Sequence, residues 1–333
     1  MSRPTPARPL VLVFVIDPIA SLNPAHDTSV AMMEAAQERG HRVLVTTMAQ
    51  LEVRDARAHA LCTPVRVHPA VLRDGRWTAR PDWYVAGTAQ RWPLDDADAV
   101  FVRTDPPVDA AYLRGTFILD LVDRRRTAVV NEPAGLRDAN EHLFGLRFPE
   151  LCPDTLVTSD VAGIVEATRR WGRAVVKPTD GMAGRGIMLL RPDDPNLRSI
   201  LESATTRGRD QVVVQRYVAA ASEGDRRVIL LDGVPIGAVR RVATGTEFRC
   251  NMAVGAVPVA DTVTPRDKEL CAVIADRLVA HGLTFVGLDL IGDYVTEINV
   301  TSPTGVREID AFDGTRLCDQ VIASVEQRAA VPS

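Results

Sequence analysis

Short apolar runs rich in β-branched residues alternate with longer amphipathic stretches along this chain. Such alternation is typical of α/β architecture, and it predicts mostly parallel strands. In the first part of the chain the pattern predicts strands over residues 10–16, 42–46, 98–103 and 128–131, and helices over 28–39, 110–124 and 136–144. The stretch 51–94 shows no clear period, and there we expect a hairpin and loops.

A second group of elements is predicted after Pro149. It comprises helices over 160–171, 267–281 and from 315 onward, and strands over 174–177, 187–190, 211–215, 227–231, 234–239, 284–290 and 294–299. The pair Asp232-Gly233 between two of these strands is a strong signal for a hairpin turn. A chain of 333 residues exceeds what one hydrophobic core usually holds, so we expect two or three domains.

Composition excludes several classes of protein. Hydrophobic residues make up 46% and charged residues 25%, as in ordinary globular proteins, and a net charge of -4 gives no support for a nucleic-acid partner. No apolar run approaches the roughly 20 residues that cross a bilayer, so no membrane partner is expected. The five cysteines are scattered without a CxxC pair, which argues against a disulfide framework or zinc site and favours the cytoplasm.

A buried strand delivers Lys177 to a loop that contains Gly181, Gly184 and Gly186. Glycines let backbone N–H groups approach an anion closely, and the lysine adds a point charge for phosphate oxygens. The spacing differs from that of a Walker P-loop. This cluster therefore predicts phosphate binding, with a flexible hairpin and an exposed lysine as the alternative.

Oxygen-bearing side chains gather on the last two predicted strands. Glu297 and Asn299 are two positions apart on one strand, so their side chains share a face. Asp289 joins that face if the two strands form an antiparallel hairpin. Two carboxylates and an amide oxygen suit Mg²⁺ held jointly with nucleotide phosphates. Ordinary salt bridges on a solvated face are the alternative, although the surrounding strands are strongly apolar.

A basic cluster flanks the predicted hairpin and the segment 244–255. It consists of Arg226, Arg227, Arg240, Arg241 and Arg249. On alternating strand positions some of these arginines must face inward, where a guanidinium can clamp a carboxylate or an acyl phosphate; surface solvation is the alternative. A lysine, magnesium and arginines together can support amide formation through an acyl phosphate without a nucleophilic side chain.

Several motifs resemble those of bacterial glutathione synthetase. They are DPIA at 17–20, DTS at 27–29, RTDPP at 103–107, KPTDGM at 177–182, FVGLDLIGD at 285–293 and TEINVTSPT at 296–304. The resemblance implies the three-domain ATP-grasp fold within the α/β class, with an N-terminal parallel-sheet preATP-grasp domain. The implied domains are 1–138, 139–219 and 220–333, the last two holding ATP between them.

The resemblance also implies roles for single residues. For ATP these are Lys177, His142, Gly181, Gly184, the hinge residues Gln215, Arg216, Tyr217 and Val218, and Asp225 near the ribose. For the metal they are Asp289, Glu297 and Asn299, which would bind Mg²⁺ or alternatively Mn²⁺. For the substrates they are Asp17, Asp27, Ser29, Arg103, Arg241, Ser302 and Thr304. For catalysis they are Arg227 at the acyl phosphate, and Arg249 and Asn251 on a closing loop over 244–255.

The implied reaction is ATP-dependent joining of γ-glutamylcysteine to glycine, with small-molecule acid and amine substrates and a homo-oligomeric enzyme. The chain departs from the family pattern at His142, where a lysine is usual, at Gly305, where a cysteine is usual, and in a glycine-poor closing loop. These departures keep two alternatives open. One is a paralogue that joins a different acid and amine in specialised biosynthesis, and the other is a nucleotide-binding protein without catalysis.

Overall fold

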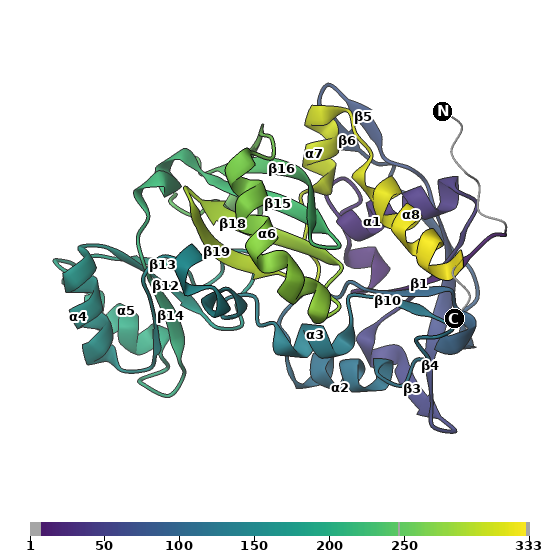
Figure 1. The fold of residues 1–333 in the computed structure, drawn as a ribbon, viewed down its shortest axis with the longest axis horizontal. Helices are drawn as coiled ribbons and strands as arrows, with labels where there is room; N and C mark the ends of the chain where they lie inside the picture. Colours follow the sequence, from purple (N-terminus) through teal and green to yellow (C-terminus); the bar gives the residue numbers. More distant parts are fainter. Residues whose placement is uncertain (1–7, 246, 331–333) are drawn as a thin grey trace.

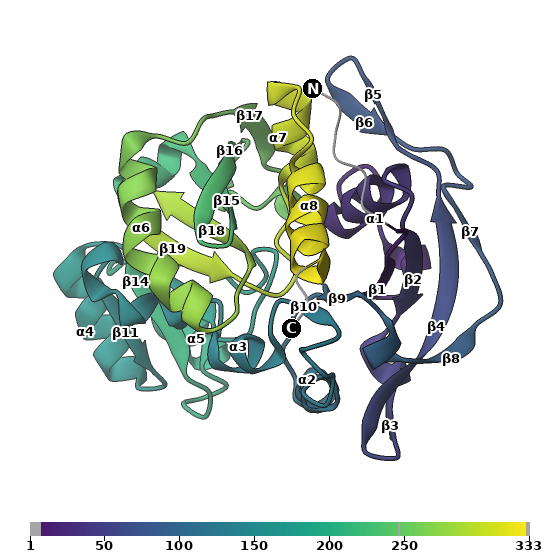
Figure 2. The same cartoon turned by 45° about the vertical axis from the view of Figure 1, so that its right-hand side comes forward.

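The computed structural model describes residues 8–245 and 247–330. Its strands form three main sheets and one short two-stranded ladder. Figure 1 shows the sheet of the middle of the chain at the left, the C-terminal sheet in the centre beneath helix α6, and the N-terminal sheet at the right. The N- and C-terminal sheets thus lie side by side, and the middle unit projects from the C-terminal one (Figures 1 and 2).

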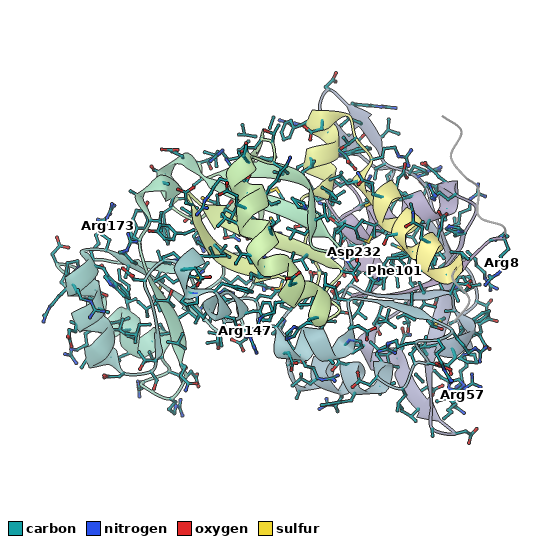
Figure 3. All side chains as sticks on the ribbon, viewed as in Figure 1. Arg8, Arg57, Phe101, Arg147, Arg173 and Asp232 are labelled. Atoms are coloured by element: carbon teal, nitrogen blue, oxygen red, sulfur yellow. The ribbon has the colours of Figure 1, made fainter. Side chains whose placement is uncertain are left out.

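Four parallel strands form one side of the N-terminal sheet, as the sequence predicted. Their order is β10 (Ala128–Val130), β9 (Ala99–Val102), β1 (Val11–Val15) and β2 (Arg42–Thr46). Phe14 of β1 stacks on Phe101 of β9 with ring centroids 4.5 Å apart, and Figure 3 labels Phe101 within this unit. Helices α1 (Thr28–Glu38), α2 (Ala110–Leu119) and α3 (Pro133–Asp138) belong to the same part of the chain.

The stretch 51–94 contains more strand than the sequence predicted. It forms β3 (Leu51–Arg54), β4 (Arg57–Val67), β5 (Val71–Arg73), β6 (Arg76–Thr78), β7 (Tyr84–Ala86) and β8 (Gln90–Pro93). Strand β4 pairs antiparallel with β2, β3, β7 and β8. Its buried positions include Ala58, Ala60 and Cys62. These small side chains give a weak hydrophobic period, which explains why the sequence did not reveal an eleven-residue strand.

The other two main sheets are antiparallel throughout. The middle one has the order β11 (Thr155–Thr158), β14 (Val212–Arg216), β12 (Ala174–Pro178), β13 (Met188–Leu190), with helices α4 (Val161–Trp171) and α5 (Leu197–Ala204). The C-terminal one has the order β17 (Val257–Ala260), β16 (Val234–Val242), β15 (Asp225–Leu231), β18 (Phe285–Ile291), β19 (Tyr294–Asn299), with helix α6 (Pro265–Ala280).

The expectation of mostly parallel strands is therefore wrong beyond the N-terminal sheet. Tight turns at Asp232-Gly233 and Gly292-Asp293 join strands that are neighbours in both sequence and sheet, and such turns require antiparallel pairing. At Asp232-Gly233 both residues have positive φ, of 52° and 76°, which is typical of the predicted hairpin turn. An apolar run has the same appearance in either kind of sheet, so periodicity alone could not decide.

Two predicted helices end earlier than expected. Helix α2 stops at Leu119, and α3 stops at Asp138 rather than continuing to residue 144. After α3 the chain turns because the Asn140 side-chain oxygen accepts the backbone N–H groups of His142 and Leu143, each at 3.1 Å. Side-chain capping of this kind competes with helix continuation. The turn places residues 140–142 beside the strands of the C-terminal sheet, where the backbone N–H of Ile298 donates to the carbonyl of Glu141.

The end of the chain returns to the N-terminal unit. Helices α7 (Val306–Asp313) and α8 (Leu317–Ala330) follow the last strand, and α8 packs against α1, as Figure 2 shows. Asn131 also ties the two units together. Its buried amide donates to the carbonyls of Phe285 and Val300 at 2.8 and 2.7 Å, and its oxygen accepts the Phe285 N–H at 2.8 Å. The domain limits implied by the resemblance stay a prediction.

Short 3-10 helices complete the fold. They are η1 (Ile19–Ser21), η2 (Met48–Gln50), η3 (Leu94–Asp96), η4 (Phe144–Arg147), η5 (Pro149–Leu151), η6 (Ala219–Glu223) and η7 (Met252–Val254). Within the described ranges, no helix combines the length and apolar character needed to cross a membrane.

Candidate active site

Two adjoining cavities contain most of the predicted site residues. Cavity A is lined by Asp105, Pro106, Glu141, His142, the loop 181–185, Ile187, Arg227, Arg241, Asn251, Met252, Ala253, Glu297, Asn299 and 301–304. Cavity B is lined by Pro153, Val175, Lys177, Ile187, the segment 215–218, Ala221, Asp225, the segment 248–251, Asp289, Ile291, Thr296 and Glu297. The cavities share Ile187, Asn251 and Glu297, so they adjoin between the start of β13, the segment 244–255 and the end of β19.

Lys177 and Glu297 meet where the middle and C-terminal sheets approach each other. Lys177 lies near the end of β12 and is 5% exposed. Its ammonium donates to the Thr296 carbonyl at 3.1 Å and lies 3.5 Å from Glu297 Oε1. The exposed-lysine alternative is therefore wrong. The convergence of a lysine from the middle of the chain with the oxygen ligands near its end is present in the structure.

The glycine loop contacts the segment 244–255, of which Thr246 lies outside the described residues. The Arg249 guanidinium donates to the Gly184 carbonyl at 2.9 Å. Gly184 has a φ of +77°, and a Cβ there would lie 2.6 Å from the Asn251 side-chain oxygen. A Cβ on Gly181 would lie 2.5 Å from the Pro178 ring. Two glycines therefore allow a backbone approach that larger residues would prevent.

Glu297 and Asn299 present oxygens suited to a hard cation. Strands β18 and β19 pair antiparallel, with Asp289 opposite Glu297, so all three predicted ligands share one face. The Asn299 amide nitrogen donates to the Gly287 carbonyl at 3.3 Å and to Asp289 at 3.2 Å, and among the described residues nothing donates to its Oδ1. This arrangement leaves the amide oxygen free as a ligand. These donors fit Mg²⁺, which prefers carboxylate and amide oxygens.

Asp289 differs from the other two candidate ligands because arginines surround it. It is 2% exposed, and its two oxygens accept from Arg227 at 2.6 and 2.7 Å, while Arg241 lies 2.9 Å away. Arg241 also holds both oxygens of Asp225, at 2.7 and 2.5 Å. The result is a buried chain of alternating charges, Asp225–Arg241–Asp289–Arg227. Each charge is paired, which is the condition under which burial is tolerated.

Burial and pairing act in opposite directions on the two carboxylates of this chain. The guanidinium groups of Arg227 and Arg241 hold the pKa of Asp289 well below its usual range, against the effect of burial. Burial raises the pKa of Asp225 to about 6 despite its pairing with Arg241. Asp225 lines cavity B, and both of its oxygens accept hydrogen bonds from Arg241, so it belongs to the ion-pair chain.

The arginine cluster divides between the two faces of the sheet. Arg227 and Arg241 face the cavities, whereas Arg226 and Arg240 point to the opposite face and pair with Asp261 at 3.0 and 2.8 Å. This division follows from the alternation of side chains along β15 and β16. Arg226 and Arg240 thus face away from the cavities, where they are partly buried in ion pairs with Asp261.

The predicted hinge residues 215–218 all line cavity B. Three of their side chains are held by neighbouring groups. Gln215 donates to the Thr155 hydroxyl at 3.2 Å, Arg216 pairs with Asp154 at 3.0 Å, and the Tyr217 ring lies under the Arg173 guanidinium at 4.4 Å. Figure 3 labels Arg173 at the side of the middle unit. The backbone of this segment is thereby fixed along one wall of the cavity.

The predicted substrate residues form two groups. Arg241, Ser302 and Thr304 line cavity A. Asp17, Asp27, Ser29 and Arg103 do not, and they lie behind its wall instead. Arg103 is 4% exposed and donates to the Ser29 hydroxyl at 3.1 Å and to the Pro303 carbonyl at 2.9 Å.

Asp17, Asp27, Ser29 and Arg103 contact the residues that form the wall of cavity A, or the neighbours of those residues, without lining the cavity themselves. Asp17 accepts the backbone N–H of Asp105 at 2.8 Å, and Asp105, which does line cavity A, accepts a hydrogen bond from Ser302. Asp27 caps α1 by accepting the Val30 N–H at 2.9 Å. Burial raises the pKa of Asp17 and of Asp27. These contacts hold the wall formed by residues 302–304 in place.

His142 lies in cavity A, between the glycine loop and Glu297. Its Nε2 is 3.1 Å from the Gly181 carbonyl. Its Nδ1 is 4.0 Å from Glu297 Oε1 and has no hydrogen-bond partner among the residues that the structure describes. The structure also places Glu141 and Arg185 on the cavity wall, and neither was selected from the sequence. Glu141 directly precedes His142, and Arg185 lies between Gly184 and Gly186, so a charged residue beside a predicted ligand was the available signal.

Comparisons with known proteins identify the family. The model of the prokaryotic glutathione synthetase N-terminal domain matches residues 10–137, and that of the prokaryotic glutathione synthetase ATP-grasp domain matches residues 141–314. The chain is 51% identical to the glutathione synthetase of Thermosynechococcus vestitus over 312 residues, 94% of this chain and 98% of that one. It is 39% identical to that of Xanthomonas axonopodis over 322 residues, 96% and 99% of the two chains.

Solved structures agree at the level of the fold. D-cycloserine synthetase DcsG aligns with a TM-score of 0.64 at 17% identity, covering 95% of this chain and 99% of that one. D-alanyl-alanine synthetase A of Vibrio cholerae aligns with a TM-score of 0.57 at 14% identity, covering 97% and 99%. From the two family models and these relatives, we conclude that the chain belongs to the prokaryotic glutathione synthetase family and is an ATP-grasp ligase.

Proposed function

We propose that this chain joins γ-glutamylcysteine to glycine at the expense of ATP, forming glutathione, ADP and phosphate. The observation that carries the proposal is the meeting of Lys177, Glu297 and Asn299 with the paired arginines Arg227 and Arg241 around two adjoining cavities. Relatives about half identical to the chain bear the name glutathione synthetase, which favours this substrate pair over the paralogue alternative.

ATP would occupy cavity B with its phosphates directed toward cavity A. The walls of cavity B supply apolar contacts from Val175, Ile187 and Ile291 for the base. Lys177 and the glycine loop then lie at the junction of the two cavities, where a cation and backbone N–H groups would neutralise phosphate oxygens. Phosphoryl transfer needs mainly this positioning and neutralisation.

Glu297 and Asn299 would hold Mg²⁺, and Asp289 would orient Asn299 by accepting its amide hydrogen bond. Bound there, the metal would supply positive charge that neutralises the phosphate groups of ATP. Lys177 would also neutralise phosphate charge, because its ammonium lies 3.5 Å from the metal-binding carboxylate of Glu297.

The carboxylate of the acid substrate would lie beside Arg227 and Arg241 in cavity A. One of its oxygens attacks the γ-phosphorus, the bond to the β-phosphate oxygen breaks, and an acyl phosphate and ADP result. The amine then attacks the acyl carbon, and phosphate leaves with the electrons of the C–O bond. Arg249 and Asn251 would keep the segment 244–255 against the glycine loop, which excludes water from the acyl phosphate.

Purified chain with Mg²⁺ and ATP tests this function directly. With γ-glutamylcysteine and glycine together we expect rapid ADP release and glutathione identified by mass spectrometry, and omission of either substrate should abolish the product. A panel of other acids and amines is assayed in parallel. Product with another pair but none with this one would establish the paralogue, and Mg·ATP binding without turnover on any pair would establish a nucleotide-binding protein without catalysis.

A further inference from the structure

Glu141 is a carboxylate on the wall of cavity A for which the mechanism above has no use. It lies in the turn after α3, between the capping residue Asn140 and His142. This turn crosses the end of β19, where the Glu141 carbonyl accepts the backbone N–H of Ile298 at 3.1 Å. Glu141 is therefore anchored through its backbone beside the strand that carries Glu297 and Asn299.

One oxygen of the Glu141 carboxylate makes all of its hydrogen bonds. Oε1 accepts the Val300 N–H at 2.8 Å, the Thr301 N–H at 3.0 Å and the Thr301 hydroxyl at 2.8 Å. Three donors on one oxygen fix the orientation of the carboxylate. Across the described residues, no donor or cation is paired with Oε2. The carboxylate is thus rigid, and its second oxygen is uncommitted.

Arg185 is itself a cation, and apart from Asp105 the other charged side chains of cavity A already have partners or roles in the mechanism. Arg227 and Arg241 are balanced by Asp225 and Asp289. Glu297 faces Lys177 and is assigned to the metal. Once ATP and the acid substrate bring their own anions, the remaining requirement of the reaction is a place for the amine, which carries a positive charge at neutral pH. An oriented carboxylate oxygen without a partner is suited to bind that charge.

We propose that Glu141 binds the amino group of the amine substrate through Oε2 and receives its proton during attack on the acyl phosphate. The inference rests on the function proposed above and names a catalytic residue for it. The bound ammonium passes one proton to Oε2, the freed nitrogen electron pair forms the C–N bond, and phosphate departs with the C–O electron pair and takes up the second proton that the nitrogen loses. The Oε1 hydrogen bonds keep the carboxylate aligned with residues 300–301 throughout.

Asp105 is the competing candidate on the same wall. It also lines cavity A, but it is exposed, and its Oδ1 already accepts from Ser302. Asp105→Asn therefore serves as the comparison for Glu141→Gln. In Glu141→Gln the amide oxygen can keep the three hydrogen bonds of Oε1, so the variant removes the free anionic oxygen while preserving the anchor.

The experiment compares glycine with hydroxylamine, a nucleophile that is uncharged at neutral pH, using γ-glutamylcysteine, ATP and Mg²⁺. For Glu141→Gln we expect kcat/KM for glycine to fall on the order of 10²-fold, the usual scale for loss of a proton acceptor. Hydroxamate formation should stay within about threefold of wild type, because that nucleophile needs no prior loss of a proton. The glycine defect should shrink from pH 7 to pH 9 as free amine accumulates.

Four results would overturn the inference. Equal losses with both nucleophiles would mean that Glu141 only anchors residues 300–301. Normal glycine kinetics in Glu141→Gln would mean that Oε2 does not contact the amine, and a selective glycine defect in Asp105→Asn instead would transfer the role to Asp105. Wild-type enzyme that formed neither glutathione nor hydroxamate would refute the proposed function itself, and this inference with it.

Discussion

Asp289 and Glu297 have different roles in the site because different charged groups surround them. Asp289 is enclosed by two guanidinium groups, whereas Glu297 faces an ammonium at 3.5 Å and remains partly open to both cavities. Asp289 therefore supports the arginines, and Glu297 is the carboxylate most available to a metal. Their opposite positions on β18 and β19 keep the two duties adjacent.

Replacing Glu297 by glutamine tests its assignment to the metal. The change removes a charged ligand, and we expect kcat to fall on the order of 10²-fold or more, since metal charge stabilisation is worth several kcal/mol. Steady-state ADP release at increasing Mg²⁺ measures the effect. The matched control is Glu269→Gln on the exposed surface of α6, which should stay within about twofold of wild type. Near-normal kinetics in Glu297→Gln would contradict the assignment.

Gly184 is the residue where the glycine loop and the segment 244–255 approach each other. In Gly184→Ala the new methyl group would meet the Asn251 side chain, in addition to the roughly 1 kcal/mol strain of a left-handed conformation. We expect kcat to fall about tenfold because the two loops no longer close together. Gly172→Ala, at a φ of +75° with nothing within 4 Å, isolates the backbone strain. Equal kinetic defects in both variants would reject loop contact as the cause.

At the scale of elements, sequence patterns predicted the Asp232-Gly233 turn and most strands outside residues 51–94, but they missed the turn after α3. Strands β2 and β19 match the predicted bounds, and Lys177, Glu297 and Asn299 were found because charged or polar residues on apolar strands are conspicuous. Glu141 was not found, because its place depends on a turn in a stretch predicted as helix. The ion-pair chain also escaped prediction, since pairing between β15, β16 and β18 depends on sheet order that periodicity does not contain.

Asp310, which accepts a hydrogen bond at the start of α8, makes the stability of the fold depend on pH. Its Oδ1 accepts the Leu317 N–H at 2.9 Å and the Thr315 hydroxyl at 2.8 Å, while burial raises its pKa to about 6 against the influence of Arg307 and Arg316. The native state then binds more protons than the unfolded state between about pH 4 and 6. This group therefore makes the free energy of unfolding fall as pH rises through that range.

Asp310→Asn should remove this dependence while keeping both hydrogen bonds, because the amide oxygen can accept them. We expect the variant to gain stability relative to wild type from pH 4.5 to pH 7.5, by on the order of 2–3 kcal/mol. Denaturant unfolding at the two pH values measures the difference. A constant difference between the two proteins across this range would show that Asp310 does not titrate as described.

At the scale of the whole molecule, Asn131 joins the N-terminal unit to the sheet that carries the site. Asn131→Ala leaves three buried backbone groups without partners, on Phe285 and Val300, and should cost roughly 3 kcal/mol or more. Thermal unfolding compares it with Asn196→Ala, whose exposed side chain makes no capping hydrogen bond. A loss of stability no larger than in that control would mean that the units are held together elsewhere.

The central claim is that the convergence of these units activates a carboxylate as an acyl phosphate. The direct test uses γ-glutamylcysteine with ¹⁸O in the cysteinyl carboxylate, together with glycine, ATP and Mg²⁺, and measures the isotope in the inorganic phosphate by mass spectrometry. The account predicts one ¹⁸O atom transferred to each phosphate released. Phosphate free of ¹⁸O in an otherwise active enzyme would contradict it.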